Sequence, residues 1–346
     1  MEKLDLKSME INELEEYIVS LGDKKFRAKQ IYTWLHQRLV TNFDEMTDIS
    51  KVLREKLSNN TKLIALKPVK ELTSKLDGTK KFLFELDDGN VIESVFMRYK
   101  HGNSVCVSSQ VGCRMGCRFC ASTLDGLTRN LTASEILEQI YRITAITGEK
   151  ISNVVVMGSG EPFDNYDNIL KFIRILNSEM GLNISARNIT VSTCGIVDKI
   201  NELAKEKLQI TLAISLHAPN DTIRKSMMPI ANKYSIAQIM EACNNYYQNT
   251  GRRISFEYSL VQDVNDSKDN AIELAGLIKN MNCHVNLIPV NPIKERDYKE
   301  TQPQFVKHFK NMLEKNGINV TIRREMGRDI QGACGQLRKS YKEEHS

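Results

Sequence analysis

The chain has 346 residues and a mass of 39.5 kDa, enough for one large α/β domain or two smaller ones with a substantial core. Hydrophobic residues make up 41% and charged residues 26%, which argues against disordered, collagen-like and coiled-coil classes. The net charge of +5 permits a polyanionic partner without requiring one.

The compartment decides how the cysteines are interpreted. Residues 1–5 lack the apolar stretch of a secretory signal, so we expect a cytoplasmic protein. The longest apolar runs, such as residues 154–157, are too short to cross a bilayer, and no membrane partner is expected. In a reducing compartment the eight cysteines do not form a disulfide framework, so clustered ones are better explained as metal ligands or reactive thiols.

The amino-terminal part is predicted to be helical. Residues 1–62 have apolar positions at three- and four-residue spacing, which indicates a small helical domain. Within it, residues 22–40 contain five lysines and arginines and one aspartate, which fits either a solvated helix face or an RNA contact. Residues 63–100 follow as a linker and a β-hairpin, with strands at 81–86 and 91–96 on either side of an Asp-Asp-Gly-Asn turn.

From residue 101 to 346, strand patterns alternate with helical ones, which predicts an α/β fold with a parallel sheet and right-handed crossovers. About six βα units indicate a partial (βα)6 barrel or an open twisted sheet, with the ligand site at the carboxyl ends of the strands. The expected strands lie near 104–108, 153–157, 188–192, 210–215, 253–259, 284–288 and 319–323. The expected helices lie near 133–147, 167–178, 197–206, 235–247, 270–280 and 302–315.

Three cysteines follow the first of these strands in one loop. Cys113, Cys117 and Cys120 have the spacing CxxxCxxC, and closely spaced thiolates suit an iron–sulfur cluster or zinc. A zinc site with Cys106 as the fourth ligand is the alternative. The spacing and the loop position favour a four-iron cluster, in which three cysteines leave one iron free to chelate a small molecule through oxygen and nitrogen.

This motif after the first strand of a βα repeat resembles the radical S-adenosylmethionine (SAM) superfamily. The resemblance implies a 4Fe-4S cluster that binds the amino and carboxyl groups of SAM and cleaves it to a 5′-deoxyadenosyl radical. Gly160 and Glu161, after the second strand, resemble the amino-group motif of that superfamily, and the glycine is expected to let backbone approach a ligand. The other cofactor-binding candidates at strand ends are Ser192, Ser215, Leu216, His217 and Asn291.

Two further cysteine segments narrow the resemblance. Residues 329–337 contain Cys334 and residues 106–112 begin with Cys106, and together with the cluster motif they resemble the RlmN family. The resemblance covers nearly the whole chain and includes residues 43–48 and 215–221. It implies a methyltransferase that acts on C2 of an adenosine in the peptidyl transferase centre of 23S rRNA and of the adenosine 3′ to the anticodon in some tRNAs.

Extra cysteines make chemical sense because C2 of adenine has no lone pair to attack the SAM methyl group. The resemblance implies that Cys334 takes a methyl group from one SAM and that a second SAM supplies the radical that activates it. It further implies that Cys106 releases the product by forming a disulfide with Cys334, and that Glu93 accepts the C2 proton. An exposed strand carboxylate is the structural alternative for Glu93. The remaining cysteines, Cys194, Cys243 and Cys283, are interpreted as small buried hydrophobic residues.

RNA is the expected partner. Residues 315–342 carry seven lysines and arginines against two acidic residues around Cys334, which suits phosphate neutralisation. With residues 22–40 this segment is predicted to form two walls of a groove that delivers a flipped-out adenosine. Charge reversal at Arg323 and Arg324 is predicted to weaken RNA binding. We also expect an electron donor such as flavodoxin or ferredoxin, and a monomer.

Three alternatives stay open at this point. A Cfr-type enzyme would share the carrier cysteine but methylate C8 of adenosine, although residues 160–162 and 217–220 follow the RlmN pattern. A non-catalytic, metal-stabilised RNA-binding protein would leave the SAM-like strand ends unexplained. A radical SAM enzyme for a small molecule or a protein would leave Cys106 and Cys334 unexplained.

Overall fold

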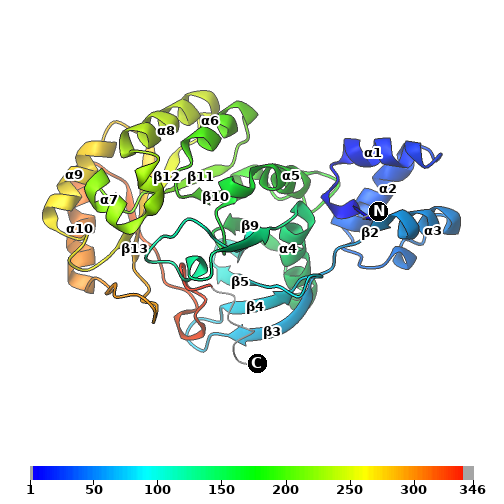
Figure 1. Ribbon diagram of the computed structural model, residues 1–346, viewed down its shortest axis with the longest axis horizontal. Coiled ribbons are helices and arrows are strands. Elements are labelled where there is room, and N and C mark those ends of the chain that lie inside the picture. The colour runs from blue at the N-terminus through cyan, green and yellow to red at the C-terminus, as the bar shows by residue number, and fades with distance from the viewer. Residues whose placement is uncertain (1–2, 338–346) are drawn as a thin grey trace.

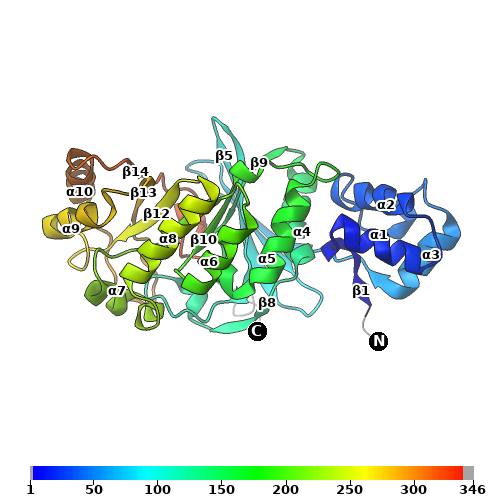
Figure 2. The same cartoon turned by 90° about the horizontal axis from the view of Figure 1, so that it is seen from above.

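The computed structural model describes residues 3–337, with a helical domain at one end and a ten-stranded sheet flanked by helices (Figure 1). Seen from above, the helical domain stands beside α4 and α5, away from the far end of the sheet (Figure 2). None of the helices in the described part of the chain has the length and apolarity that a membrane span needs.

The amino-terminal domain is helical, as predicted, because its helices bury apolar residues at three- and four-residue spacing such as Leu14, Ile18, Ile31 and Leu35. The structure adds two short parallel strands that the sequence did not indicate. The helices are α1 (Ile11–Ser20), α2 (Phe26–His36) and α3 (Lys51–Asn60), and the strands are β1 (Leu4–Asp5) and β2 (Thr61–Lys62).

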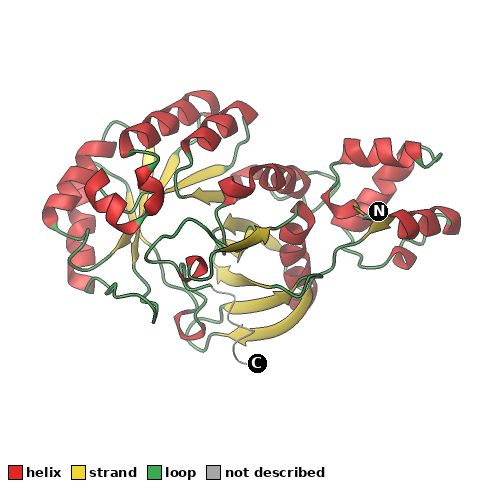
Figure 3. Ribbon diagram, in the orientation of Figure 1, coloured by secondary structure: helices red, strands yellow, loops and turns green. Residues whose placement is uncertain are grey.

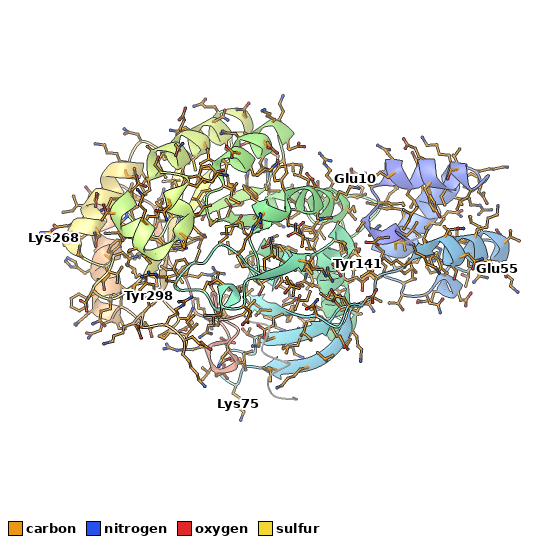
Figure 4. All side chains as sticks on the ribbon, in the orientation of Figure 1. Glu10, Glu55, Lys75, Tyr141, Lys268 and Tyr298 are labelled. Carbon is orange, nitrogen blue, oxygen red and sulfur yellow. The ribbon has the colours of Figure 1, made fainter. Side chains whose placement is uncertain are left out.

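Buried polar contacts join this domain to α4 (Ala133–Thr147). Lys7 Nζ lies 2.5 Å from Glu138 Oε1, and both side chains are fully buried. His36 Nδ1 lies 2.8 Å from the hydroxyl of Tyr141, which Figure 4 labels on α4. Because an unpaired buried charge is costly, these pairs fix how the domain sits on α4.

The fully buried His36 makes the stability of this contact pH-dependent. Burial, with a smaller effect of the nearby Lys7, lowers the pKa of His36 to about 3, so the folded protein keeps the ring neutral. The unfolded chain takes up a proton near pH 6.5, so this contribution to stability is complete above that pH and is lost as the pH falls towards the folded pKa.

We expect wild-type stability to fall by about 1.6 kcal/mol more than that of His36→Gln between pH 6.5 and pH 5, from the linkage relation. Urea unfolding of both proteins at the two pH values measures the difference. Equal losses in the two proteins would contradict the assignment of a neutral buried ring.

The predicted hairpin is present as β4 (Lys80–Glu85) and β5 (Val91–Tyr99), and it extends the main sheet because β5 pairs antiparallel with β6 (Gly102–Cys106). An additional strand, β3 (Lys67–Thr73), covers the outer side of β4. The sequence did not predict β3, since its lysines and Pro68 hide the strand pattern. These are residues that an edge strand tolerates.

The six βα units of the predicted barrel are confirmed. The sheet order β14-β13-β12-β11-β10-β9-β6-β5-β4-β3 has unpaired ends, so the barrel is open, with its helices on the outer face (Figure 3). The parallel strands are β6 (Gly102–Cys106), β9 (Ile151–Val156), β10 (Ile189–Thr193), β11 (Thr211–Ser215), β12 (Ile254–Leu260), β13 (Cys283–Pro289) and β14 (Val320–Ile322).

Helices follow six of these strands in turn. They are α4 after β6, α5 (Tyr166–Asn177) after β9, α6 (Val197–Glu206) after β10, both α7 (Asp221–Met227) and α8 (Ile236–Thr250) after β11, α9 (Lys268–Ile278) after β12 and α10 (Pro303–Lys315) after β13. The sequence analysis missed α7, because its seven residues are too few to show helical periodicity. The side chain of Asn220 caps it by accepting from the backbone N–H of Ile223.

We expected the cysteine loop to follow the first barrel strand directly, but the structure places another strand between them. That strand ends at Cys106, and a separate strand β7 (Gln110–Gly112) pairs antiparallel with β8 (Leu127–Asn130). The loop that carries the three cysteines is therefore closed at its base by a small two-stranded sheet.

Candidate functional site

A cavity at the carboxyl ends of the parallel strands brings most of the predicted residues together. The thiols of Cys113, Cys117 and Cys120 line one side of it. The strand ends supply the other side, with Gly160, Glu161, Ser192, Ser215, His217 and Asn291. Since these residues come from the ends of four different strands and from the cysteine loop, the cavity depends on most of the parallel sheet.

The three thiols fit an iron–sulfur cluster by their chemistry. Burial raises the pKa of Cys113 to about 12 and that of Cys117 well above its usual range, and the neighbouring thiols add to both shifts. A cationic metal centre binds the deprotonated form of such thiols and stabilises it.

No group of three His, Cys, Asp or Glu side chains within residues 3–337 is arranged to hold a single metal ion. A four-iron cluster is larger than one ion and needs wider ligand spacing. Cys106 lines a second cavity and not this one, so the structure does not support a zinc site with Cys106 as the fourth ligand.

The glycines before Glu161 are also needed for packing within the protein. A Cβ on Gly158 would lie 2.7 Å from Ser108 Oγ, and one on Gly160, whose φ is +109°, would lie 2.6 Å from Gln110 Cβ. They therefore let this loop pack on the segment after β6. Gly160 also lines the cavity, and close approach of its backbone to a ligand stays a prediction.

The carboxylate of Glu161 is held in place by hydrogen bonds from neighbouring residues. It accepts from the backbone N–H of Phe163 at 3.0 Å and of Cys194 at 2.7 Å. Burial raises its pKa. The side chains of Thr193 and Cys194 also hydrogen-bond to it, and Glu161 lines the cavity.

His217 is neutral and fixed in one tautomer. Its Nδ1 accepts from the backbone N–H of Ser259 at 2.8 Å, so the proton is on Nε2. The ring meets Phe119 of the cysteine loop edge to face, with centroids 4.6 Å apart. Leu216, by contrast, is fully buried and does not line the cavity; its backbone N–H donates to the carbonyl of Glu257.

The segment after β14 carries Cys334 over the cavity, and we call residues 327–337 the covering segment. It is attached at both sides. The backbone N–H of Ala121 donates to the carbonyl of Gly335 at 2.8 Å, and Asn291 Nδ2 donates to the carbonyl of Cys334 at 3.0 Å. On the other side, Asp329 accepts from the backbone N–H of Lys75 in the turn between β3 and β4 (Figure 4).

The exposed Cys334 lines both the cavity of the three cysteines and a second cavity that contains the buried Cys106. Burial raises the pKa of Cys106 to about 12, with Cys334 adding to the shift. The guanidinium of Arg323 acts in the opposite direction on Cys106, and it faces both thiols. The two thiols and this cation thus form one electrostatic group.

Glu93 is buried rather than exposed, with 2% of its surface accessible. Its Oε1 lies 3.0 Å from Lys81 Nζ, and Lys81 also donates to the carbonyl of Gln331 in the covering segment. On β5, Glu93 is two residues from Val95, which pairs with Cys106, so all these side chains lie on one face of the sheet. Glu93 does not line either cavity.

Four residues of this site were not predicted to belong to it, although Arg323 was predicted to contribute to RNA binding and Cys194 to be a small buried hydrophobic residue. Cys194, buried like Cys243 and Cys283, lines the cavity beside Glu161, and Arg224, Lys81 and Arg323 supply buried or partly buried cations. No local pattern distinguishes these cations from surface ones, because their position depends on contacts between distant elements. Arg338, Lys339 and Lys342, from the predicted basic stretch, lie outside the described residues.

Two family models match the chain. The model of the ribosomal RNA large subunit methyltransferase N-terminal domain matches residues 4–63, and that of the radical SAM superfamily matches residues 107–275.

Two bacterial proteins, each named probable dual-specificity RNA methyltransferase RlmN, are similar over nearly the whole chain. The protein of Lachnospira eligens is 67% identical over 340 residues, which cover 98% of this chain and 97% of that protein. The protein of Lachnoclostridium phytofermentans is 61% identical over 340 residues, with coverages of 98% and 96%.

A crystal structure of a radical SAM methyltransferase from Sphaerobacter thermophilus is similar in fold as well as sequence. It has a TM-score of 0.93 and 44% identity, and the alignment covers 97% of this chain and 100% of that one. The radical SAM fold expected from the sequence is therefore confirmed.

Proposed function

Since the chain belongs to the RlmN family of radical SAM RNA methyltransferases, we propose that it methylates C2 of adenosine in 23S rRNA and in tRNA. The observation that carries this proposal is the position of Cys334. Its thiol lines the cavity of the three cluster cysteines and also the cavity of Cys106. One sulfur can therefore receive a methyl group on one side and meet a second thiol on the other.

In this proposal Cys113, Cys117 and Cys120 hold a 4Fe-4S cluster, and Gly160, Glu161 and the other strand-end residues hold SAM. When bound, the cluster supplies the electron that cleaves one SAM to a 5′-deoxyadenosyl radical. Two SAM molecules are used per turnover, because another SAM donates its methyl group to Cys334.

The chain's own residues perform the remaining work. The Cys334 thiolate attacks the methyl group of SAM, forms a carbon–sulfur bond and releases S-adenosylhomocysteine. The methyl group on Cys334 would then give one hydrogen atom to the 5′-deoxyadenosyl radical, and its methylene carbon would form a bond to C2 of the adenine. Glu93 would accept the proton that leaves C2, and the surplus electron would return to the cluster. Finally, the Cys106 thiolate attacks Cys334 Sγ, and a disulfide forms as the methylated base leaves. Arg323, which faces both thiols, favours the anionic form of Cys106.

The position of the new methyl group tests the proposal. The anaerobically reconstituted protein is incubated with SAM, a reductant and either an rRNA fragment or a tRNA, and the nucleosides are compared with 2-methyladenosine and 8-methyladenosine. We expect 2-methyladenosine from both RNAs. A product methylated at C8 would instead assign the Cfr-type reaction, and an unmodified RNA with iron-loaded protein would contradict both.

We further propose that the protein works in the cytoplasm as a monomer, with flavodoxin or ferredoxin as the electron donor. The basic segments 22–40 and 315–342 are its proposed RNA contacts. In the first of them Lys24, Lys25, Lys29 and Arg38 are exposed. In the second, Arg324 is exposed at the cavity that contains Cys106, which suits a phosphate near the target nucleotide.

Arg324→Glu is expected to weaken RNA binding and to lower the slope of log affinity against log salt by about 1, the change for one lost phosphate contact. Lys268→Glu is the matched control, since Lys268 is exposed on α9 at the outer edge of the molecule (Figure 4). Filter-binding titrations at several salt concentrations measure both. The same slope in the Arg324 variant and the wild type would remove Arg324 from the interface.

A further inference from the structure

Arg224 in α7 is fully buried, and it forms no ion pair with an acidic side chain of the described residues. Its Nε donates to the carbonyl of Leu216 at 3.2 Å. Its Nη2 donates to the carbonyls of Cys194 at 2.6 Å and of Ser215 at 3.4 Å. Nη1 is buried and has no hydrogen-bond partner. Neutral carbonyls satisfy these donors but leave the positive charge uncompensated.

Two other buried cations in residues 3–337 each have an acidic partner. Lys7 is paired with Glu138, and Lys81 is paired with Glu93 at 3.0 Å. Arg224 takes part in no ion pair among these residues. A buried charge without a partner is strongly destabilising, so the retention of Arg224 calls for an anion that the polypeptide itself does not supply.

The groups around Arg224 indicate where such an anion would bind. The groups that interact with it electrostatically are the thiols of Cys194 and Cys117 and the carboxylate of Asp221. Asp221 has a smaller effect on the pKa of Arg224 than either thiol and forms no ion pair with it; it is partly exposed, and its Oδ1 accepts from the backbone N–H of Ile236. Cys117 is one of the three proposed cluster ligands.

The helix of Arg224 is also attached to the cysteine loop. The backbone N–H of Arg118, next to Cys117, donates to the carbonyl of Met227 at the end of α7, at 3.0 Å. Pro229, just after α7, lies against Gly116, because a Cβ on that glycine would be 3.2 Å from its ring. Arg224 is therefore held at a fixed position relative to the cluster ligands.

We propose that Arg224 is the buried counter-charge of the iron–sulfur cluster and that it makes the cluster easier to reduce. This inference rests on the proposed function, in which Cys113, Cys117 and Cys120 hold the cluster. Four-iron clusters with three thiolates carry net negative charge, and reduction adds one more. A fixed cation nearby stabilises the reduced form more than the oxidised form, and net charge is one of the factors that set cluster potentials. Arg224 is thus a positioning residue that acts through the cluster.

The test is the midpoint potential of the reconstituted cluster without SAM, measured by potentiometric titration with electron paramagnetic resonance. Arg224→Gln removes the charge and keeps a donor for the carbonyls, and Arg224→Lys keeps the charge. The matched control is Arg252→Gln, because Arg252 also donates to backbone and hydroxyl oxygens but at the opposite end of β11. Iron and sulfide are counted in every protein.

We expect Arg224→Gln to have an at least tenfold smaller one-electron reduction constant, which is a shift of about 59 mV to more negative potential. Arg224→Lys should stay close to the wild type, and Arg252→Gln should not shift. An iron-loaded Arg224→Gln protein with the wild-type potential would overturn the proposal. Wild-type protein that takes up no iron would instead overturn the cluster assignment itself.

If Arg224→Gln fails to hold iron, its cluster potential cannot be measured. The melting temperatures of the metal-free full-length wild type and variant then test whether the charge or the hydrogen bonds of Arg224 matter. Without the cluster, the wild type keeps an unpaired buried charge, so metal-free Arg224→Gln should melt at the same or a higher temperature. A metal-free variant that melts well below the metal-free wild type would show that the carbonyl hydrogen bonds, and not the charge, are the role of Arg224.

Discussion

Cys334→Ala is expected to reduce RNA methylation by more than about 10⁴-fold, the order of loss when an enzyme is deprived of its covalent nucleophile. The fold and the iron content should not change. The side chain of Cys334 is exposed, and the backbone carbonyl that Asn291 holds is retained in alanine. The loss therefore reports on the thiol alone.

Peptide mass spectrometry on wild-type protein made with its cluster should find one added methyl group on Cys334. That methyl group should be absent when Cys117 is replaced by alanine. Cys283→Ala is a suitable control, because it removes a buried thiol at the start of β13 and should keep most of the activity. Methylation by Cys334→Ala at more than a few per cent of the wild-type rate would exclude a carrier cysteine.

Cys106→Ala is expected to stop turnover after the methyl carbon has bonded to the adenine, and to leave the RNA covalently attached to the protein. Without the Cys106 thiolate nothing attacks Cys334 Sγ, so the methylated adenosine stays bound through its carbon–sulfur bond. A covalent protein–RNA species should appear on denaturing gels. The double variant with Cys334→Ala should not form it.

The same experiment separates Cys106 from a merely structural role. Cys106 pairs with Val95 at the end of β6, and alanine fits a strand position of that kind. Loss of activity through misfolding would give neither the adduct nor methylated Cys334. Multiple turnovers by Cys106→Ala would show that another group releases the product.

The sequence predicted what is encoded locally. The alternation of strands and helices predicted the six βα units, and the three cysteines with their spacing predicted the cluster loop at the correct end of the sheet. Elements with weak local signals were missed, such as the seven-residue α7 and the lysine-rich edge strand β3. Their structure is decided by partners that are distant in sequence.

The same reasoning explains the gaps in the predicted site. The burial of Glu93 depends on Lys81 in the neighbouring strand and on the covering segment. Arg224 and Arg323 look like ordinary surface cations in the sequence, yet one is fully buried and the other faces two thiols. Resemblance to a family identified Cys334 and Cys106, but the contacts around them required the structure.

The covering segment also has a consequence for the order of synthesis. The hydroxyl of Ser122 donates to the carbonyl of Leu337, which lies 215 residues later in the chain. At ribosomal speeds this interval is roughly 10 to 40 s. The three thiols of the cysteine loop therefore leave the ribosome uncovered, and Cys334 closes over them only when the chain is nearly complete. A nascent chain thus passes through a stage in which the proposed iron site is open before the proposed methyl acceptor, Cys334, has arrived.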